Sequence, residues 1–454
     1  MNSITRVLKR SASICALLAG IAHGQVYELT EQSWDNPEFR ARFLESYLGQ
    51  SEVNPKISPE EKALFDEIVP LISSSPNEAV EKLQTALGPE SSAAFDFILG
   101  NLLYQEGDAL KAAEAYEKAI KKFSNYFMAY YNAGRAYVAE GQYASALAHL
   151  QDALEIQSGD GSLYGLIGYC YINLDRPATA LDAYRVAVML APESRDWKLG
   201  KLQCHVALEQ REDAIGLLYE FIEDEPDNAD WWKLQANQFL ALGDVGKAAA
   251  NLTVVRDMGK ADGASLSLLG DLLLNEGLVQ AAMESYFLAL DRKQARVGRV
   301  FEVANSLIML GEMDQAEGFV AKVDQTIGGD FSGEEAIEFL NIKARLAMET
   351  DDVETAAEFL EQIVTRDPMN GYALLTLSDL ERSRGDLAKA VFFAENASKV
   401  QEFEHQACLT LAQLKVGQKD YREAAKHLRR AQQIQPKDYV ADYLLKIEQA
   451  ALRM

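Results

Sequence analysis

Histidines and carboxylates are the side chains of this sequence that could carry acid–base or metal chemistry, and their spacing favours neither. No two histidines beyond residue 24 have the spacing of metal ligands on one helix. The chain has no glycine-rich phosphate loop and no nucleophile elbow. Its 69 acidic residues guarantee chance carboxylate pairs, so no pair predicts a catalytic site. We therefore expect a protein that is not an enzyme and that has no cofactor or metal. The histidines in question are His149, His205, His405 and His427.

One sequence pattern is repeated along most of the chain, most clearly in the adjoining copies Phe127–Asp160 and Gly161–Ser194. Superposing these two copies places Gly134 on Gly168. A fixed period of about 34 residues is typical of stacked repeats, each a pair of helices. The units are expected to begin at Glu60 (a weak unit), Ala93, Phe127, Gly161, Arg195, Ala229, Gly263, Val297, Ile337, Gly371 and His405.

Small residues recur at two places in these units. One series includes Gly100, Gly134 and Gly168, and the other, twelve positions later, includes Ala112 and Ala146. Two helices approach closely only where neither carries bulk. Each unit is therefore expected to be a tight antiparallel helix hairpin.

The turn between the two helices also has a signature, as in Gly107-Asp108, Gly243-Asp244 and Gly385-Asp386. The glycine can adopt the left-handed conformation that ends a helix, and the aspartate can cap the next helix. In four units another residue holds the glycine's place. These residues are Asp175, Glu209, Asp351 and Lys419.

The chain resembles tetratricopeptide-repeat proteins, in particular those that bacteria export. The residues that carry the resemblance are Tyr164, Ile167, Gly168, Tyr171, Ala180, Tyr184, Ala187 and Pro192. The resemblance implies an all-α fold, a right-handed α-solenoid of about ten to eleven helix hairpins with a C-terminal capping helix. It also implies a partner bound along the concave face, which is lined by the first helix of each unit.

The same resemblance places particular side chains on that concave face, at residues 2, 5, 9, 12 and 13 of each unit. The strongest candidates are Tyr131, Arg135 and Tyr169, and the alternative is that several of the aromatic residues are half-buried packing residues. The partner-binding residues expected there are Asn101, Tyr104, Tyr131, Arg135, Tyr169, Ile172, Gln203, Lys233, Asn237 and Asn305, with Phe97, Leu199 and Phe301 on the same face.

Some members of the resembled family grip a terminal carboxylate with lysine, asparagine and arginine from three units. Lys233 and Asn237 match the first pair only, and the following units offer Leu268, Gly298 and Glu302 instead. We therefore expect no such clamp. Next to this pair, Trp232 is expected in the core and Trp231 is expected to be the more exposed of the two tryptophans.

Two cysteines, Cys170 and Cys204, are one repeat apart and so occupy the same place in successive first helices. Helix axes pack about 8–10 Å apart, whereas a disulfide needs Cα atoms closer than about 7 Å. We therefore expect buried free thiols. With Cys408, the count beyond residue 24 is odd, which argues against a disulfide framework.

One register break interrupts the array, because the distance from Val297 to Ile337 exceeds one repeat. The surplus, residues 331–336, is either a joint between two lobes or a looped-out insertion that leaves the stacking intact. The expected divisions are a signal peptide at 1–24, an extension with a short helix at 25–59, the first lobe at 60–330, this segment, the second lobe at 337–436, and a capping helix at 437–454. Val440, Leu444, Leu445 and Ile447 are expected on the cap's buried face.

The N-terminus has the pattern of a secretory signal peptide. Basic residues precede the apolar run Ile14–Ala22, and Ala22-His23-Gly24 fits a cleavage site that leaves Gln25 first. An uncleaved anchor is the alternative. Cleavage removes three of the 44 basic residues and no acid, so the net charge becomes 41 − 69 = −28. That charge disfavours binding to nucleic acid or to an anionic membrane.

These features predict an exported, periplasmic scaffold that binds protein or peptide partners in cell-envelope assembly, export or transport. A groove that binds a glycan or peptidoglycan strand is the alternative. An enzyme with a site hidden between units and a cytoplasmic scaffold are weaker alternatives. We expect the cleaved protein not to insert into a membrane and to meet its partners in the periplasm. The sequence does not specify its oligomeric state.

Overall fold

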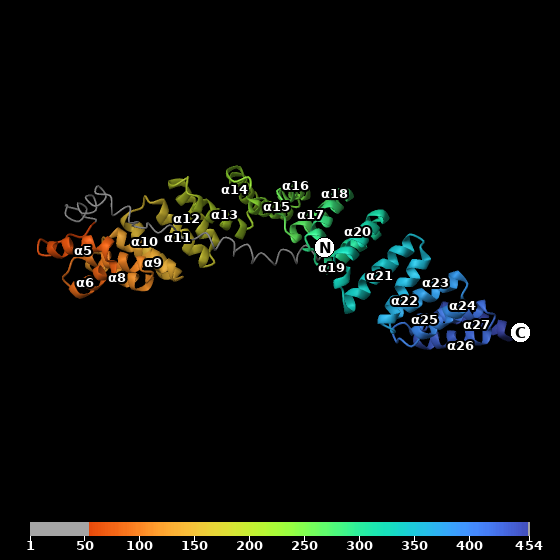
Figure 1. Ribbon diagram of the computed structural model, residues 1–454. Coiled ribbons are helices and arrows are strands. Elements are labelled where there is room, and N and C mark those ends of the chain that lie inside the picture. Colours follow the sequence, from red (N-terminus) through yellow and green to blue (C-terminus); the bar gives the residue numbers. More distant parts are fainter. Residues whose placement is uncertain (1–53, 453–454) are drawn as a thin grey trace. The chain divides into compact units, whose positions relative to one another are not determined.

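The computed structural model describes residues 54–452, so the predicted signal peptide at 1–24 and the predicted extension at 25–59, apart from its last six residues, lie outside the described residues. The described chain is all-α: it forms 23 α-helices and one 3₁₀-helix and contains no strand (Figure 1). The first 22 α-helices pair as eleven consecutive hairpins, and one helix follows them. The predicted fold class, an α-solenoid of helix hairpins, is confirmed.

The hairpins fall into two compact units that divide between Pro226 and Asp227. Unit 1 holds α5 (Lys62–Ser74), α6 (Pro76–Ala86), α7 (Ala93–Gln105), α8 (Ala109–Lys122), α9 (Phe127–Ala139), α10 (Tyr143–Ile156), α11 (Gly161–Asn173), α12 (Pro177–Leu190), α13 (Arg195–Ala207) and α14 (Arg211–Asp224).

Unit 2 contains the remaining hairpins and the last helix. Its elements are α15 (Ala229–Leu242), α16 (Val245–Asp257), α17 (Gly263–Asn275), α18 (Val279–Asp291), α19 (Val297–Leu310), α20 (Met313–Thr326), η2 (Gly328–Asp330), α21 (Gly333–Glu349), α22 (Val353–Arg366), α23 (Gly371–Arg384), α24 (Leu387–Ala397), α25 (Glu404–Gly417), α26 (Tyr421–Ile434) and α27 (Asp438–Leu452).

The repeat period predicted the helix starts closely. Eight predicted unit starts are the first residues of α7, α9, α11, α13, α15, α17, α19 and α23. The largest departure is α21, which begins at Gly333 because part of the surplus segment extends this helix at its N-terminus. Phe331 in the same segment packs edge-on against Phe301 and Phe339, at ring-centroid distances of 5.3 and 5.0 Å. The segment is thus tied to the core of unit 2, and its role as a joint stays a prediction.

Close contact between the two helices of a hairpin explains the series of small residues. A Cβ placed on Gly134 would lie 2.6 Å from the side chain of Leu150, which is fully buried. A Cβ on Gly100 would lie 2.5 Å from the ring of Tyr116. A large residue of the second helix therefore fills the space that the glycine leaves. The sequence had placed the small residue Ala146 opposite Gly134; the structure places the Ala146 backbone oxygen 3.4 Å from a Cβ on Gly134 and Leu150 closer still.

The predicted left-handed turn residues are confirmed, including those that are not glycine. Asp175, Glu209, Asp351 and Lys419 have φ angles of 58°, 56°, 58° and 63°. This conformation costs a residue with a side chain about 1 kcal/mol or more. Since these four residues adopt the left-handed conformation despite this cost, the hairpin geometry determines the turn conformation more than the intrinsic backbone preference of the residue does.

Aspartate caps the second helix in five hairpins. Asp108, Asp244, Asp352, Asp386 and Asp420 each accept a hydrogen bond from the backbone N–H three positions on, at 3.0–3.2 Å. In the other six described hairpins the N-cap side chain of the second helix makes no such bond, and in α17/α18 this residue is Leu278.

The C-terminal helix α27 packs against α26 and buries Val440 and Ile447. The prediction for Leu445 was wrong, since this side chain is 56% exposed. A helix turns about 100° per residue, so Leu445 lies well off the stripe that runs through Val440 and Ile447. Tyr443 and Leu444 complete the packed side.

None of the helices within residues 54–452 combines the length and the apolar character needed to cross a bilayer.

Replacing Gly134 with alanine tests the close approach of the helices. Overpacking against Leu150 should exceed the gain in helix propensity and lower the free energy of unfolding by about 1–2 kcal/mol. Gly216 in α14 is the control, because a Cβ there would meet nothing within 4 Å, and Gly216→Ala should stabilise by about 0.5–1 kcal/mol. Urea unfolding followed by circular dichroism measures both, and equal shifts of the same sign would contradict the packing argument.

Candidate functional site

The candidate site is a row of side chains on the first helices of consecutive hairpins, each at the same place in its repeat. In unit 1 it contains Asn101 on α7, Arg135 on α9, Tyr169 on α11 and Gln203 on α13, all partly buried. We call these four residues the unit 1 row. Because α9 packs against α11 and α11 against α13, the last three members lie on neighbouring helices.

Arg135 is the most distinctive member of the row. Its guanidinium carbon lies 5.6 Å from the ring centroid of Tyr104 and 5.9 Å from that of Tyr131. Cation–π contacts of this kind contribute about 0.5–2 kcal/mol, more where water is excluded. Within residues 54–452 the guanidinium has no carboxylate partner and no hydrogen bond. The two tyrosines therefore hold a partly buried cation whose N–H groups are available.

The side-chain oxygen of Asn101 is used in hydrogen bonds within the protein. Its Oδ1 accepts hydrogen bonds from the Tyr116 hydroxyl at 2.8 Å and from Asn132 Nδ2 at 3.0 Å. Tyr116 is almost fully buried, and burial raises the pKa of its hydroxyl. Asn132, which the sequence reasoning missed, links this network to the next hairpin. Asn101 thus satisfies a buried hydroxyl.

Tyr169 and Ile172 lie on α11 next to this network. The Tyr169 ring meets Tyr143 edge-on at 5.9 Å, and burial raises the pKa of the Tyr169 hydroxyl. Ile172 packs partly buried against the cluster around Tyr184. Both residues retain some exposure, so they can border a bound partner.

Residues four positions before the row are packing residues. Phe97, Tyr131, Leu199 and Phe301 were placed on the concave face by the sequence, but the structure buries all four. Tyr131 stacks on Phe127 at 6.0 Å between centroids. These four side chains are buried because the fifth residue of a repeat, on the first helix, faces the neighbouring hairpin. A partner would approach the Tyr131 ring from the side that Arg135 covers.

In unit 2 the candidate residues do not form one cluster. Lys233 is paired with Asp230 at 2.7 Å. Asn237 is exposed on α15, and Asn305 accepts a hydrogen bond from Arg345 at 3.3 Å. Arg345 was not singled out by the sequence.

The expectation that Trp231 is the more exposed of the two tryptophans was wrong. Trp231 is buried and Trp232 is only partly buried, packed against a core cluster of α15 to α18. Trp231 occupies the place of Phe95 and Leu163 in earlier first helices, where the side chain faces the core. The burial of Trp231 thus follows from its position in the repeat.

A charged cluster in unit 2 was also missed. Arg299 pairs with Asp271 and Glu302, and the Tyr286 hydroxyl donates to Asp271 at 2.7 Å. Burial raises the pKa of Asp271, and hydrogen bonds from Arg299 and Tyr286 oppose that rise. The sequence did contain a sign of this cluster: Arg299 stands at the repeat position that Phe95 occupies in α7 and Trp231 occupies in α15.

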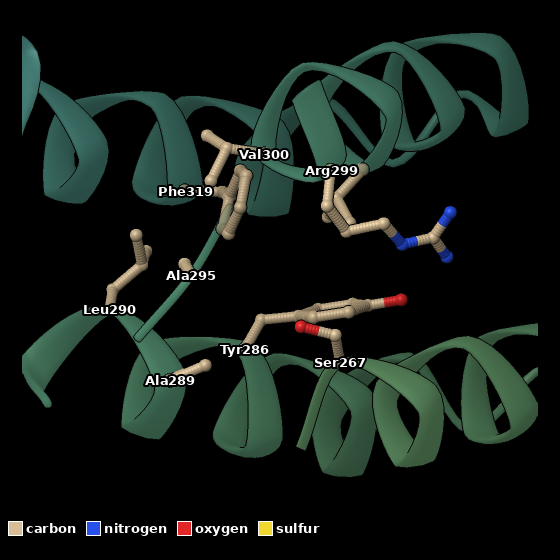
Figure 2. A pocket seen from close by; sticks show the side chains of 9 residues that line it. Ser267, Tyr286, Ala289, Leu290, Ala295, Arg299, Val300 and Phe319 are labelled. Atoms are coloured by element: carbon tan, nitrogen blue, oxygen red, sulfur yellow. The ribbon is translucent and has the colours of Figure 1, made fainter. Parts of the chain in front are cut away.

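This cluster borders a shallow recess, which Figure 2 shows with Arg299 and the hydroxyls of Tyr286 and Ser267 at one end. Leu290, Val300 and Phe319 line the other end. Since the Tyr286 hydroxyl and Arg299 are engaged with Asp271, the cluster's main role is to join α17, α18 and α19.

The thiols of Cys170 and Cys204 are buried and free, as predicted, and the thiol of Cys408 is also buried and free. Burial raises the pKa of Cys170 and of Cys204 to about 12, so both remain protonated and unreactive at neutral pH. In the part of the chain that the structure describes, no group of His, Cys, Asp and Glu is arranged to hold a metal ion.

Comparison with family models finds tetratricopeptide repeats along most of residues 73–438. One such model matches residues 103–168 and 171–237. A second matches 73–127, 233–296 and 343–399, and a third matches 405–438.

Among curated proteins, the general transcriptional corepressor trfA of Dictyostelium discoideum is 28% identical over 98 residues, 22% of this chain and 7% of that protein. The human superkiller complex protein 3 is 23% identical over 221 residues, 47% of this chain and 14% of that protein. The matches thus span only a small part of either relative's length.

Among solved structures, YrrB, described as a TPR protein with an unusual peptide-binding site, is 22% identical with a TM-score of 0.37. The match covers 42% of this chain and 96% of YrrB. The pilus biogenesis factor PilW is 20% identical with a TM-score of 0.32, covering 42% and 90% of the two chains. These likenesses concern the fold alone.

Replacing Asn101 with alanine tests whether this residue is structural. The buried Tyr116 hydroxyl would lose its acceptor, so the free energy of unfolding should fall by about 1–3 kcal/mol. In a Tyr116→Phe background the same replacement should cost less, because that hydroxyl is already gone. Urea unfolding of the single and double variants gives the coupling, and strictly additive effects would contradict the network.

Proposed function

The chain belongs to the tetratricopeptide-repeat family, whose members are typically non-catalytic protein–protein interaction scaffolds, and we propose that this one binds a polypeptide through Arg135 and the unit 1 row. The partner would lie across α9, α11 and α13 and place a carboxylate on the Arg135 guanidinium. The proposal also assigns the protein to the periplasm, in envelope assembly, export or transport, with no catalytic step of its own.

The observation that carries the proposal is the unused guanidinium of Arg135. The chain has 69 acidic and 44 basic residues, so a carboxylate is a readily available partner for any of its cations. Arg135 nevertheless has none among the described residues. Instead, the rings of Tyr104 and Tyr131 hold it through cation–π contacts. A planar guanidinium held in this way is well suited to bind a carboxylate through two parallel hydrogen bonds.

The rest of the row supplies contacts to a polypeptide main chain and to apolar side chains. Tyr169 and Gln203 are partly exposed and can donate and accept hydrogen bonds. Ile172 offers an apolar contact one helical turn from Tyr169. A surface of mixed amide, phenol and apolar groups is suited to a polypeptide segment.

Two features of the whole sequence support the proposed location and partners. The N-terminal basic and apolar pattern supports export with cleavage before Gln25. The net charge of −25 disfavours nucleic acid, and it favours partners that contact the chain through local features such as Arg135.

Replacing Arg135 with glutamine tests the proposed anchor. Loss of hydrogen bonds to a charged group costs about 1.5–3 kcal/mol, so the affinity for the partner should fall about 10- to 100-fold. Arg135→Lys keeps the positive charge but cannot form two parallel hydrogen bonds with a carboxylate, so it should show most of the same loss of affinity. Quantitative pull-down from envelope extract identifies the partner, and titration with the purified partner measures the affinity.

Arg176 provides the matched control, because it is exposed on the turn before α12 and has no side-chain partner among the described residues. Arg176→Gln removes the same charge and should bind as the wild type does. If the two glutamine variants behave alike, net charge alone drives binding and Arg135 is not the anchor.

The location has its own test. The protein purified from its native cells after fractionation should be found in the periplasm, and N-terminal sequencing should read from Gln25. A protein that stays in the cytoplasm would contradict export, and an exported protein that retains residues 1–24 would contradict cleavage before Gln25; either result would leave the Arg135 site untouched.

A further inference from the structure

Unit 2 exposes a set of large apolar side chains along one edge. They stand at the turns of the hairpins α15/α16, α17/α18 and α19/α20, and we call them the turn-edge patch. Its members are Leu242 (45% exposed), Leu278 (55%), Met309 (76%) and Leu310 (59%). The three hairpins follow one another along the chain, so these turns recur at the same place in three consecutive repeats.

Leu278 is the one apolar residue among the N-caps of the second helices in the described hairpins, although the N-caps of α6, α10, α12, α14 and α20 also make no side-chain hydrogen bond. It occupies the N-cap of α18, where Asp108, Asp244 and Asp386 hydrogen-bond the helix N-terminus in other hairpins. A leucine forgoes that bond, and this one is not buried in return. Met309, at the end of α19, is even more exposed. Exposed apolar side chains at the turns of three consecutive hairpins offer a candidate interaction surface.

The charges around the patch indicate what binds there. Glu276 is the C-cap of α17, Glu312 is the N-cap of α20, and Asp314 lies in the first helical turn of α20. None of the three has an ion-pair partner within the described chain. Asp244 forms an ion pair with Lys247 at 2.8 Å, so these two residues add no net charge next to the patch. The apolar patch is thus bordered by three uncompensated negative charges, which complement a basic partner.

The size of the patch indicates the shape of that partner. Neighbouring helices pack about 8–10 Å apart, so three successive hairpin turns span about 20 Å. A helix of about 14 residues has this length at a rise of about 1.5 Å per residue. A second copy of this chain is a poor fit, because its net charge of −25 would be repelled.

We propose that the turn-edge patch docks a basic amphipathic helix of a protein partner, with the apolar face of that helix on Leu278 and Met309. Its lysines or arginines would then meet Glu276, Glu312 and Asp314. This surface is separate from the unit 1 row, so one scaffold would hold two segments of opposite charge.

The probe is a fluorescein-labelled helix of about 14 leucine and lysine residues, with all leucines on one face, titrated with the full chain. Saturable binding should weaken as salt rises, because the acidic border contributes. The same peptide with glutamate in place of lysine should not bind. Equal binding of both peptides would overturn the proposal, since it would show unspecific apolar contact.

Leu278→Asn combined with Met309→Gln tests the patch itself. Asparagine is a good N-cap residue, so this variant should fold at least as well as the wild type while binding the lysine peptide about tenfold more weakly or worse. Met189, 72% exposed in unit 1, gives the control Met189→Gln, which should bind as the wild type does. Arg135→Gln should also leave this affinity unchanged, so the two proposals fail separately.

Two further results would overturn the proposal: a patch variant that keeps the lysine peptide's affinity, or a wild-type dimer, seen by light scattering, that this variant abolishes. The second result would show that the patch joins two copies of the chain. If neither is found and only the patch variant loses the peptide, the proposal is supported.

Discussion

The close approach of two helices at a small residue is the contact on which the rest of the structure depends. Gly134 lets Leu150 pack directly on the backbone of α9, and Gly100 does the same for Tyr116 on α7. A side chain at either glycine would push the hairpin apart. Since each hairpin supplies the surface on which the next one packs, this spacing is carried along each unit.

Against this regular background, polar and apolar residues that depart from the repeat carry the functional information. Asn101 departs from it and is used by Tyr116 and Asn132. Arg299 departs from it and is neutralised by Asp271. Arg135 lies on two tyrosine rings but has no carboxylate partner in the described chain, and Leu278 remains exposed, which is why each leads to a proposal about a partner.

Much of the fold was predictable from the sequence, because its determinants are local. The turn residues, including Asp175 and Lys419, follow from the position of a chain reversal in each repeat. Less of the candidate site was predictable. Tyr131 and Tyr169 seemed equivalent members of one face, but Tyr131 is buried on Phe127 whereas Tyr169 remains partly exposed. A residue's burial depends on the neighbouring hairpin, and the repeat pattern of one helix does not report it.

The sequence by itself determined the period, the hairpins and the caps, since turn conformation and capping involve residues only a few positions apart. Only the tertiary structure decided which side chains remain available. The hydroxyl that occupies Asn101 comes from another helix, and the two rings that hold Arg135 come from two different hairpins. The same holds for Leu278, whose place in the turn is local but whose exposure depends on what packs around it.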